Sequence, residues 1–183
     1  MRDEKPSKAR WIQSVLREHE KPLVRYAQHL TGSLDMARDA VQETFLRLCV
    51  QDPGKLEGRI TPWLFAVCRS RALDALRKER RLSASDVDGE NEQDFALESD
   101  AGPSELYEQT EVIARILRIL GKLSANQQEV IRLRFEESFS YQEISQVTGL
   151  SMTNVGFLLH AGLKAIRLAL EPKEDAPVLR RIK

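Results

Sequence analysis

Basic side chains crowd the stretch from residue 61 to residue 81, where aromatic side chains also occur. Trp63 and Phe65 lie near its start, and the six cations that follow are Arg69, Arg71, Arg77, Lys78, Arg80 and Arg81. Cations bind the phosphates of a nucleic acid, and aromatic rings stack on its unpaired bases. Two cations at the end of a helix would be enough to stabilise its dipole. The excess of cations therefore predicts a surface that contacts nucleic acid.

The residues that most often perform catalysis or bind metals show no comparable organisation. The three histidines and two cysteines have no metal-ligand spacing to one another; they are His19, His29, His160, Cys49 and Cys68. The sequence contains no nucleophile elbow, no phosphate-binding loop and no dinucleotide-binding glycine motif. Many of the carboxylates lie in a segment that would not hold them in a catalytic geometry. We therefore expect that the chain is not an enzyme and binds no metal or other cofactor.

Charge is distributed unevenly along the 183 residues, although 28 Lys and Arg balance 28 Asp and Glu overall. Counted along the sequence, the net charge is +6 for residues 1–82, −10 for 83–111, +3 for 112–170 and +1 for 171–183. Residues 83–103 are also rich in Gly, Ser and Asp and lack apolar periodicity. The pattern predicts two small domains, residues 1–82 and 104–170, joined by an acidic flexible linker over 83–103 and followed by a short tail over 171–183.

Both predicted domains have helical patterns, and no run alternates with the period of a strand, so we expect an all-α fold. In the first domain, helices are expected from Lys8 to about Thr31 with a bend at Pro22, from Ser33 to about Val50, and from Thr61 to Arg81. A short loop over residues 55–60 is expected to precede the last of these helices.

The second domain has clearer helix boundaries. Capping boxes open helices at Ser124 and Ser140, and a helix is also expected over residues 105–123. The helix that begins at Ser140 is short and ends at Gly149, after which Ser151 caps a longer helix. A short helix, a glycine-containing turn and a longer helix are typical of a helix-turn-helix. This motif also occurs in proteins that never touch DNA, so by itself it leaves the function open.

Three segments occur in a characteristic order along the chain: the run DAVQETFLRL at residues 39–48, the basic segment 61–81, and the helix-turn-helix within residues 120–167. In this order they resemble the extracytoplasmic-function (ECF) class of bacterial RNA polymerase sigma factors. Residues 39–48 are similar to the polymerase-binding helix of region two in that family. Residues 61–81 are similar to the helix that melts promoters and recognises the minus-ten element, and residues 120–167 are similar to region four. The resemblance covers both domains and leaves out only the linker and the two termini.

The resemblance implies a sigma factor that binds core RNA polymerase and directs promoter-specific transcription initiation. The residues implied to contact the polymerase are Asp39, Gln42, Glu43, Phe45 and Leu46. Those implied to contact DNA at the minus-ten element are Trp63, Arg69, Arg71, Arg77, Lys78, Arg80 and Arg81. Those implied at the minus-thirty-five element are Ser151, Thr153, Asn154, His160 and Lys164.

Other expectations concern a protein partner, the location in the cell and the role of the linker. Family members are commonly held inactive by an anti-sigma factor, so such a partner is implied here. No apolar run is long enough to span a membrane and the first residues are not a secretory signal, so we expect a cytoplasmic protein without membrane insertion. The linker is interpreted either as a tether or as a segment that mimics nucleic acid in a basic channel.

The chain departs from the family pattern at three positions. Gly156 and Leu158 stand where Lys and Arg are common, and Ser70 stands where Asn is usual. Phe157 and Leu158 are each interpreted as a core residue or as an apolar contact with a thymine methyl; we expect one of them in the core, and the other stays open. Two rival functions stay open at this point: a stand-alone two-domain helix-turn-helix regulator that binds DNA without polymerase, and an adaptor that binds only proteins.

Overall fold

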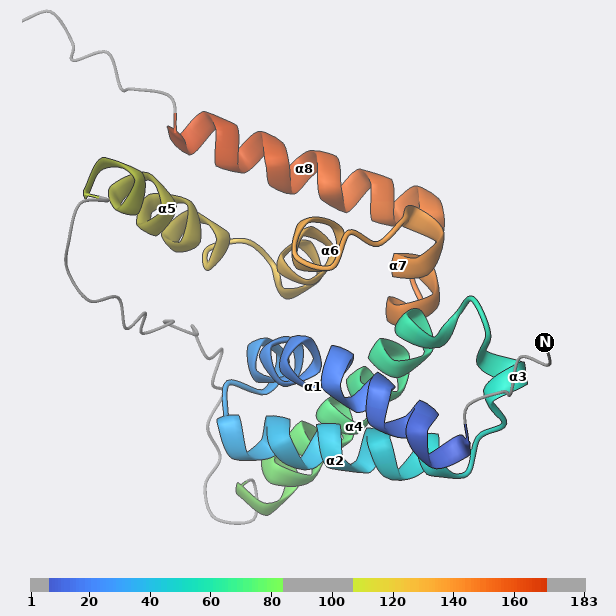
Figure 1. Ribbon diagram of the computed structural model, residues 1–183. Helices are drawn as coiled ribbons and strands as arrows, with labels where there is room; N and C mark the ends of the chain where they lie inside the picture. Colours follow the sequence, from blue (N-terminus) through green and yellow to red (C-terminus); the bar gives the residue numbers. More distant parts are fainter. Residues whose placement is uncertain (1–6, 84–106, 171–183) are drawn as a thin grey trace, which may run out of the picture.

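The computed structural model describes residues 7–83 and 107–170, and in these two ranges all regular secondary structure is α-helical. The expected all-α fold is confirmed. Figure 1 shows that helices α1 to α4 form one group and helices α5 to α8 form a second group that lies directly against it. Residues 84–103 of the expected linker and the expected tail, 171–183, lie outside the described residues.

The first group consists of α1 (Lys8–Thr31), α2 (Leu34–Cys49), α3 (Pro53–Leu56) and α4 (Ile60–Ser83). The three long helices pack on one another in every pairing. Gly32 ends α1 because it adopts φ +70°, a left-handed conformation that glycine tolerates best. The Ser33 hydroxyl then caps α2 by accepting a hydrogen bond from the Met36 N–H (3.4 Å).

Two local expectations in this group need correction. The segment expected to be a loop over residues 55–60 contains part of α3, which begins at Pro53 because Asp52 caps it by accepting from the Gly54 N–H (3.0 Å). Helix α4 begins at Ile60, one residue before the expected cap at Thr61. Pro22 lies inside α1, which continues past it to Thr31.

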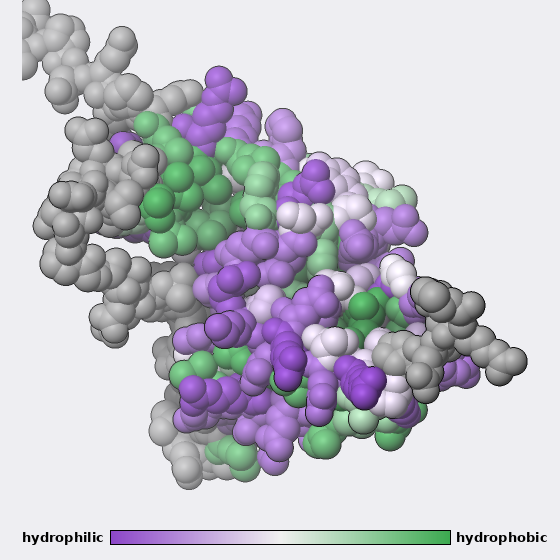
Figure 2. Space-filling view, in the orientation of Figure 1, coloured by the Kyte–Doolittle hydropathy of each residue, from purple (hydrophilic) through white to green (hydrophobic). Residues whose placement is uncertain are grey.

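The second group consists of α5 (Tyr107–Leu120), α6 (Ala125–Phe135), α7 (Tyr141–Thr148) and α8 (Met152–Leu170). Both expected capping boxes are confirmed, with Ser124 paired to Gln127 and Ser140 paired to Glu143. Helices α6 and α8 approach closely because Gly162 has no side chain: a Cβ there would lie 2.6 Å from the Cδ1 atom of Ile131. Figure 2 shows hydrophobic surface gathered over α5, while the rest of the visible face is mostly hydrophilic.

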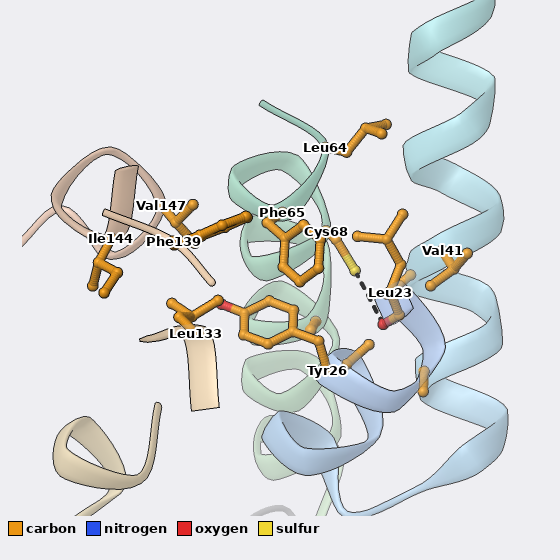
Figure 3. Close-up of a cluster of buried hydrophobic side chains, with 14 of the residues drawn as sticks. Leu23, Tyr26, Val41, Leu64, Phe65, Cys68, Leu133, Phe139, Ile144 and Val147 are labelled. Carbon is orange, nitrogen blue, oxygen red and sulfur yellow. Dashed lines mark hydrogen bonds between the residues drawn. The ribbon is translucent and has the colours of Figure 1, made fainter. Parts of the chain in front are cut away.

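The core runs through both groups of helices. Phe65 of α4 is fully buried between Tyr26 of α1, at 5.0 Å between ring centroids, and Phe139 of the α6–α7 turn, at 5.1 Å. Figure 3 shows these rings together with Leu133 and Val147, on the side of α4 that faces the second group. Aromatic pairs at this separation add to the free energy gained from burial. The sequence describes two domains connected by a linker, whereas the structure packs them against each other.

Candidate nucleic-acid and protein interfaces

The outer face of α2 carries polar side chains followed by two apolar ones. Asp39, Gln42 and Glu43 are exposed near the middle of the helix. Leu46 is 60% exposed, and Val50, four residues later at the end of the helix, is 78% exposed. Residues four apart lie on the same face of a helix. The face therefore combines polar groups with an uncovered apolar pair, which is the composition of a protein-binding surface.

Phe45, one of the residues expected to contact the polymerase, does not lie on that exposed face. Its side chain is 8% exposed and forms part of the core. Neighbouring residues on a helix point about 100° apart, so Phe45 points inward where Leu46 points outward. Phe45 instead holds α2 against the helices beneath it.

The beginning of α4 places Trp63 at the edge of the core. Its side chain is half-buried and packs against the buried cluster, while the remainder faces solvent. The backbone N–H of Trp63 donates to the Arg59 carbonyl (3.2 Å), which joins the first turn of α4 to the preceding turn. The ring is therefore anchored on one side and accessible on the other.

The end of α4 presents the basic cluster to solvent. The exposed side chains here are Arg77, Lys78, Arg80 and Arg81. Arg77 Nη1 donates to Asp74 Oδ1 at 2.9 Å across one helical turn. Both of those side chains are about half exposed or more, so the ion pair contributes little to stability. Lys and Arg at this density produce the positive field that phosphates require.

Arg71 has a different environment from the exposed cations at the end of α4. Its side chain is half-buried, and in the described part of the chain its Nε–H is one of two buried polar side-chain atoms without a hydrogen-bond partner. The other such atom is His29 Nδ1.

Arg69, which the sequence groups with the DNA-binding cations, is paired with a carboxylate of the second group. Its Nε donates to Oε1 of Glu129 at 2.7 Å, and its Nη2 donates to Oε2 at 3.2 Å. The hydroxyl of Tyr26 donates to the same Oε1 at 2.6 Å. Burial, followed by the Glu129 charge, raises the pKa of Tyr26 well above its usual value, so the hydroxyl stays protonated and remains a donor. The three residues come from α1, α4 and α6.

A second set of polar contacts borders this carboxylate. Arg132 Nη1 lies 3.0 Å from His29 Nε2 and donates to Glu136 Oε1 at 2.8 Å. Because the guanidinium can only donate, His29 accepts at Nε2 and carries its proton on Nδ1. Burial, followed by the Arg132 charge, lowers the pKa of His29 to about 4. Arg25 of α1 also forms ion pairs with Glu136 (3.2 Å) and Glu137 (2.6 Å).

Tyr26, His29 and Glu129 carry no sequence pattern that marks them as members of a polar network. In the sequence, Glu129 is a polar residue one turn into a capped helix, with nothing to distinguish it from a solvent-exposed glutamate. Its hydrogen-bond partners Arg69 and Tyr26 lie 60 and 103 residues earlier in the chain. No local pattern signals contacts over such separations. The signal available was the capping box at Ser124, which fixes the start of α6 and hence the face on which Glu129 falls.

The turn between α7 and α8 has the geometry of a helix-turn-helix. Gly149 ends α7 at φ +76°, as its place in the sequence predicts. The Ser145 hydroxyl donates to the Leu150 carbonyl (2.6 Å), and the Leu150 N–H donates to the Thr148 hydroxyl oxygen (3.3 Å). Ser151 caps α8 by accepting from the Asn154 N–H (3.2 Å). These bonds fix the angle at which α8 leaves α7.

The residues expected to face the minus-thirty-five element are all exposed on α8 or at its start: Ser151, Thr153, Asn154, His160 and Lys164. Phe157 is 68% exposed, whereas Leu158 packs against the core. Leu158 is therefore the member of this pair that lies in the core, and Phe157 faces solvent. Gly156 faces the Tyr141 ring, since a Cβ there would lie 3.5 Å from Cε2.

Residues 7–83 and 107–170 contain no group of three or more His, Cys, Asp or Glu side chains arranged to hold a metal ion. None of the helices described in these ranges is both long enough and apolar enough to cross a lipid bilayer.

Two family models match the chain, one to each group of helices. The model described as Sigma-70 region 2 matches residues 15–82, and the model described as Sigma-70, region 4 matches residues 113–166. The first match spans most of α1 and all of α2 to α4 except the last residue. The second spans most of α5 and α8 and all of α6 and α7.

Several curated proteins are similar over most of their length. The ECF RNA polymerase sigma factor SigL of Mycobacterium tuberculosis is 31% identical over 171 residues, which cover 90% of this chain and 92% of that protein. The ECF RNA polymerase sigma factor SigX of Bacillus subtilis is 28% identical over 160 residues, covering 84% and 80%. Among solved structures, the sigma factor RpoE of Bartonella quintana, in complex with the anti-sigma factor NepR, has a similar fold with a TM-score of 0.66. It is 20% identical, and the match covers 88% of this chain and 97% of that one.

Proposed function

This chain belongs to the ECF class of RNA polymerase sigma factors and is a factor that directs transcription initiation, and we propose which of its surfaces perform each step. The observation that carries the assignment is the presence of both sigma regions in order on one chain, each on its own group of helices. We assign polymerase binding and minus-ten recognition to residues 1–82, a connecting role to the linker at 83–103, and minus-thirty-five recognition to residues 104–170.

The surface proposed for core polymerase is the outer face of α2. Its polar residues Asp39, Gln42 and Glu43 supply hydrogen bonds and charge, and Leu46 supplies apolar area. Apolar residues that are uncovered in the free protein and bordered by polar ones gain free energy when a partner excludes water from them. Phe45 takes part only by supporting the helix from below.

The surface proposed for the minus-ten element lies on α4. The exposed cations at its end bind backbone phosphates, and the accessible side of Trp63 receives an unstacked base. Arg71, whose side chain is half-buried, lies on the same helix between Arg69 and the exposed cations, and we include it in this surface. Phosphate contacts of this kind position the protein on DNA and contribute little to sequence choice.

The surface proposed for the minus-thirty-five element is the beginning of α8. A recognition helix reads base edges with its N-terminal residues and phosphates with its flanks. Asn154 stands at that end and can form two hydrogen bonds to an adenine. His160 and Lys164 lie farther along the helix, where they bind phosphates. Phe157, which is 68% exposed, is available for a thymine methyl group.

Core polymerase and promoter DNA are the partners of a sigma factor, and we extend the proposal to catalysis, cellular location and an antagonist. The chain acts as a binding factor without catalysis of its own. It works in the cytoplasm, where core polymerase is found. A protein antagonist controls it; the structural neighbour from Bartonella quintana, which was solved with an anti-sigma factor, supports this. A stand-alone DNA-binding regulator is not favoured, because such a protein has no use for a region-two helix group.

Run-off transcription with purified core polymerase on a library of genomic fragments tests the function. Defined transcripts that require the added chain are expected, and their start sites would reveal the promoter sequence. The double variant Gln42→Ala with Glu43→Ala should lose co-purification with core polymerase while keeping its helical content. Wild-type affinity in this variant would show that core binding uses another face.

A further inference from the structure

A carboxylate that is almost completely withdrawn from water joins the two helix groups, beside the core that they share. The Glu129 side chain is 5% exposed, and it accepts hydrogen bonds from Tyr26 and Arg69 of the first group. These three side chains are here called the latch. The arrangement in which α1 and α4 pack against α6 and α7 is called the closed form.

The Arg69 guanidinium binds Glu129 with the same geometry that it would use for a phosphate. Two of its nitrogens donate to the two oxygens of one carboxylate, at 2.7 and 3.2 Å. Arginine forms this forked pair with carboxylates and phosphates alike. In the closed form the Nε and Nη2 side of the guanidinium is therefore occupied by Glu129, and only 23% of the Arg69 side chain is exposed.

Arg69 is located on the helix proposed to bind the minus-ten element, two turns before the exposed cations at its end. The closed form thus removes one cation from the nucleic-acid surface and covers the adjacent Phe65 with Phe139. Arg25 of α1 also forms ion pairs with Glu136 and Glu137, so the two helix groups are joined by a second set of charges. Carboxylates of the second group face arginines of the first group at both places.

We propose that Glu129 occupies, within the free chain, the position of a DNA phosphate on Arg69, so that promoter DNA and the second helix group compete for the same guanidinium. This inference rests on the proposed function, because it takes the competing ligand to be a nucleic acid. The closed form must open at the contact between α4 and α6 before Arg69 binds DNA. The apparent affinity for DNA is reduced by the fraction of chains that are closed.

Two variants of the full chain weaken the latch by different means. Glu129→Gln leaves a buried guanidinium without its counter-charge, and breaking a buried ion pair in this way shifts the closed-to-open ratio by about 100-fold or more. Tyr26→Phe removes only the hydroxyl that donates to Glu129, keeps the ring against Phe65, and changes no charge; a hydrogen bond to a charged group corresponds to a shift of about tenfold or more. Glu20→Gln is the matched control, because it makes the same charge change at an exposed position in α1.

Small-angle X-ray scattering measures opening, and fluorescence anisotropy with a short labelled single-stranded DNA of mixed sequence measures binding. Glu129→Gln and Tyr26→Phe should increase the radius of gyration and tighten DNA binding, by about tenfold for Glu129→Gln if about a tenth of the parent chains are open. Glu20→Gln should change neither. Arg69→Ala should open the chain without tightening DNA binding, because it removes the guanidinium itself.

The proposal is overturned if Glu129→Gln and Tyr26→Phe retain the radius of gyration of the parent. It is equally overturned if both open the chain and neither binds DNA more tightly, or if Arg69→Ala tightens binding as much as Glu129→Gln does. Run-off transcription by the parent chain tests the sigma-factor function separately. Failure of that assay, with opening and tighter binding both observed, would refute the proposed function and leave the latch supported.

Discussion

Replacing Leu46 by alanine should weaken the binding of core polymerase about tenfold without changing the stability of the chain. Leu→Ala removes three carbon atoms, each worth about 0.8 kcal/mol when buried. Leu46 is 60% exposed in the free chain, so about 60% of that contribution remains to be gained when a partner covers the side chain. The product is about 1.4 kcal/mol, which corresponds to about a tenfold change in Kd.

The control for this measurement is Leu168→Ala in α8. Leu168 is 58% exposed, so the same atoms are removed from a site of nearly equal exposure outside the α2 face. Competition of each variant with a fluorescently labelled parent chain for core polymerase gives the relative Kd values. Urea titrations of the two variants should agree with the parent within about 0.5 kcal/mol, as expected for exposed side chains. Equal affinities of the Leu46 and Leu168 variants for core polymerase would refute the assignment of the α2 face.

Three further predictions follow from other parts of the molecule. Burial, followed by the Arg132 charge, lowers the pKa of His29 from about 6.5 in water to about 4. Between these two pH values the folded chain binds fewer protons than the unfolded chain. The contribution of His29 to the free energy of unfolding should therefore be complete above pH 6.5 and should fall as the pH is lowered toward 4. Urea titrations should show a smaller fall in His29→Gln, and equal pH dependence would rule out His29 as the responsible group. Gly162→Ala places a Cβ 2.6 Å from Ile131 Cδ1, so overpacking of about 1–3 kcal/mol should exceed the gain in helix propensity of about 1 kcal/mol. Adding Ile131→Val should recover most of that loss in a double-mutant cycle, whereas additive losses would contradict the contact. Asn154→Ala should relax base preference at one promoter position by about 1–3 kcal/mol, while Lys164→Ala should weaken holoenzyme binding to all promoters alike; a uniform loss in Asn154→Ala would make Asn154 a phosphate ligand.

The boundaries of the helices were largely predictable because the signals that set them are local. Ser33, Ser124 and Ser140 each cap the helix that follows, and Gly32 and Gly149 each end one in the left-handed conformation. The miss at residues 55–60 has a local cause as well. In the sequence, Asp52 and Pro53 indicate the end of the preceding element, but α2 already ends at Cys49, and Asp52 instead caps the short helix α3 that begins at Pro53.

Side-chain roles were less predictable where they depend on distant parts of the chain. Arg69 lies among cations that reach solvent, yet a carboxylate 60 residues away binds it. Phe45 and Leu46 are adjacent in the sequence and the resemblance implies that both contact the polymerase, yet Phe45 is buried and Leu46 is 60% exposed. Periodicity identifies an apolar face but not its exact edge, and function is often located at that edge.

The latch also limits how such chains can be recombined. The linker looks like a free boundary at which one promoter-reading half could be exchanged for another. A chimera that joins residues 1–83 of this chain to a foreign second half would keep Tyr26 and Arg69 but receive whatever side chain the foreign α6 presents in place of Glu129. Without a carboxylate there, the hybrid begins in the open form. Chimeras built to combine promoter specificities would therefore differ from both parents in their resting state as well as in the promoters they read.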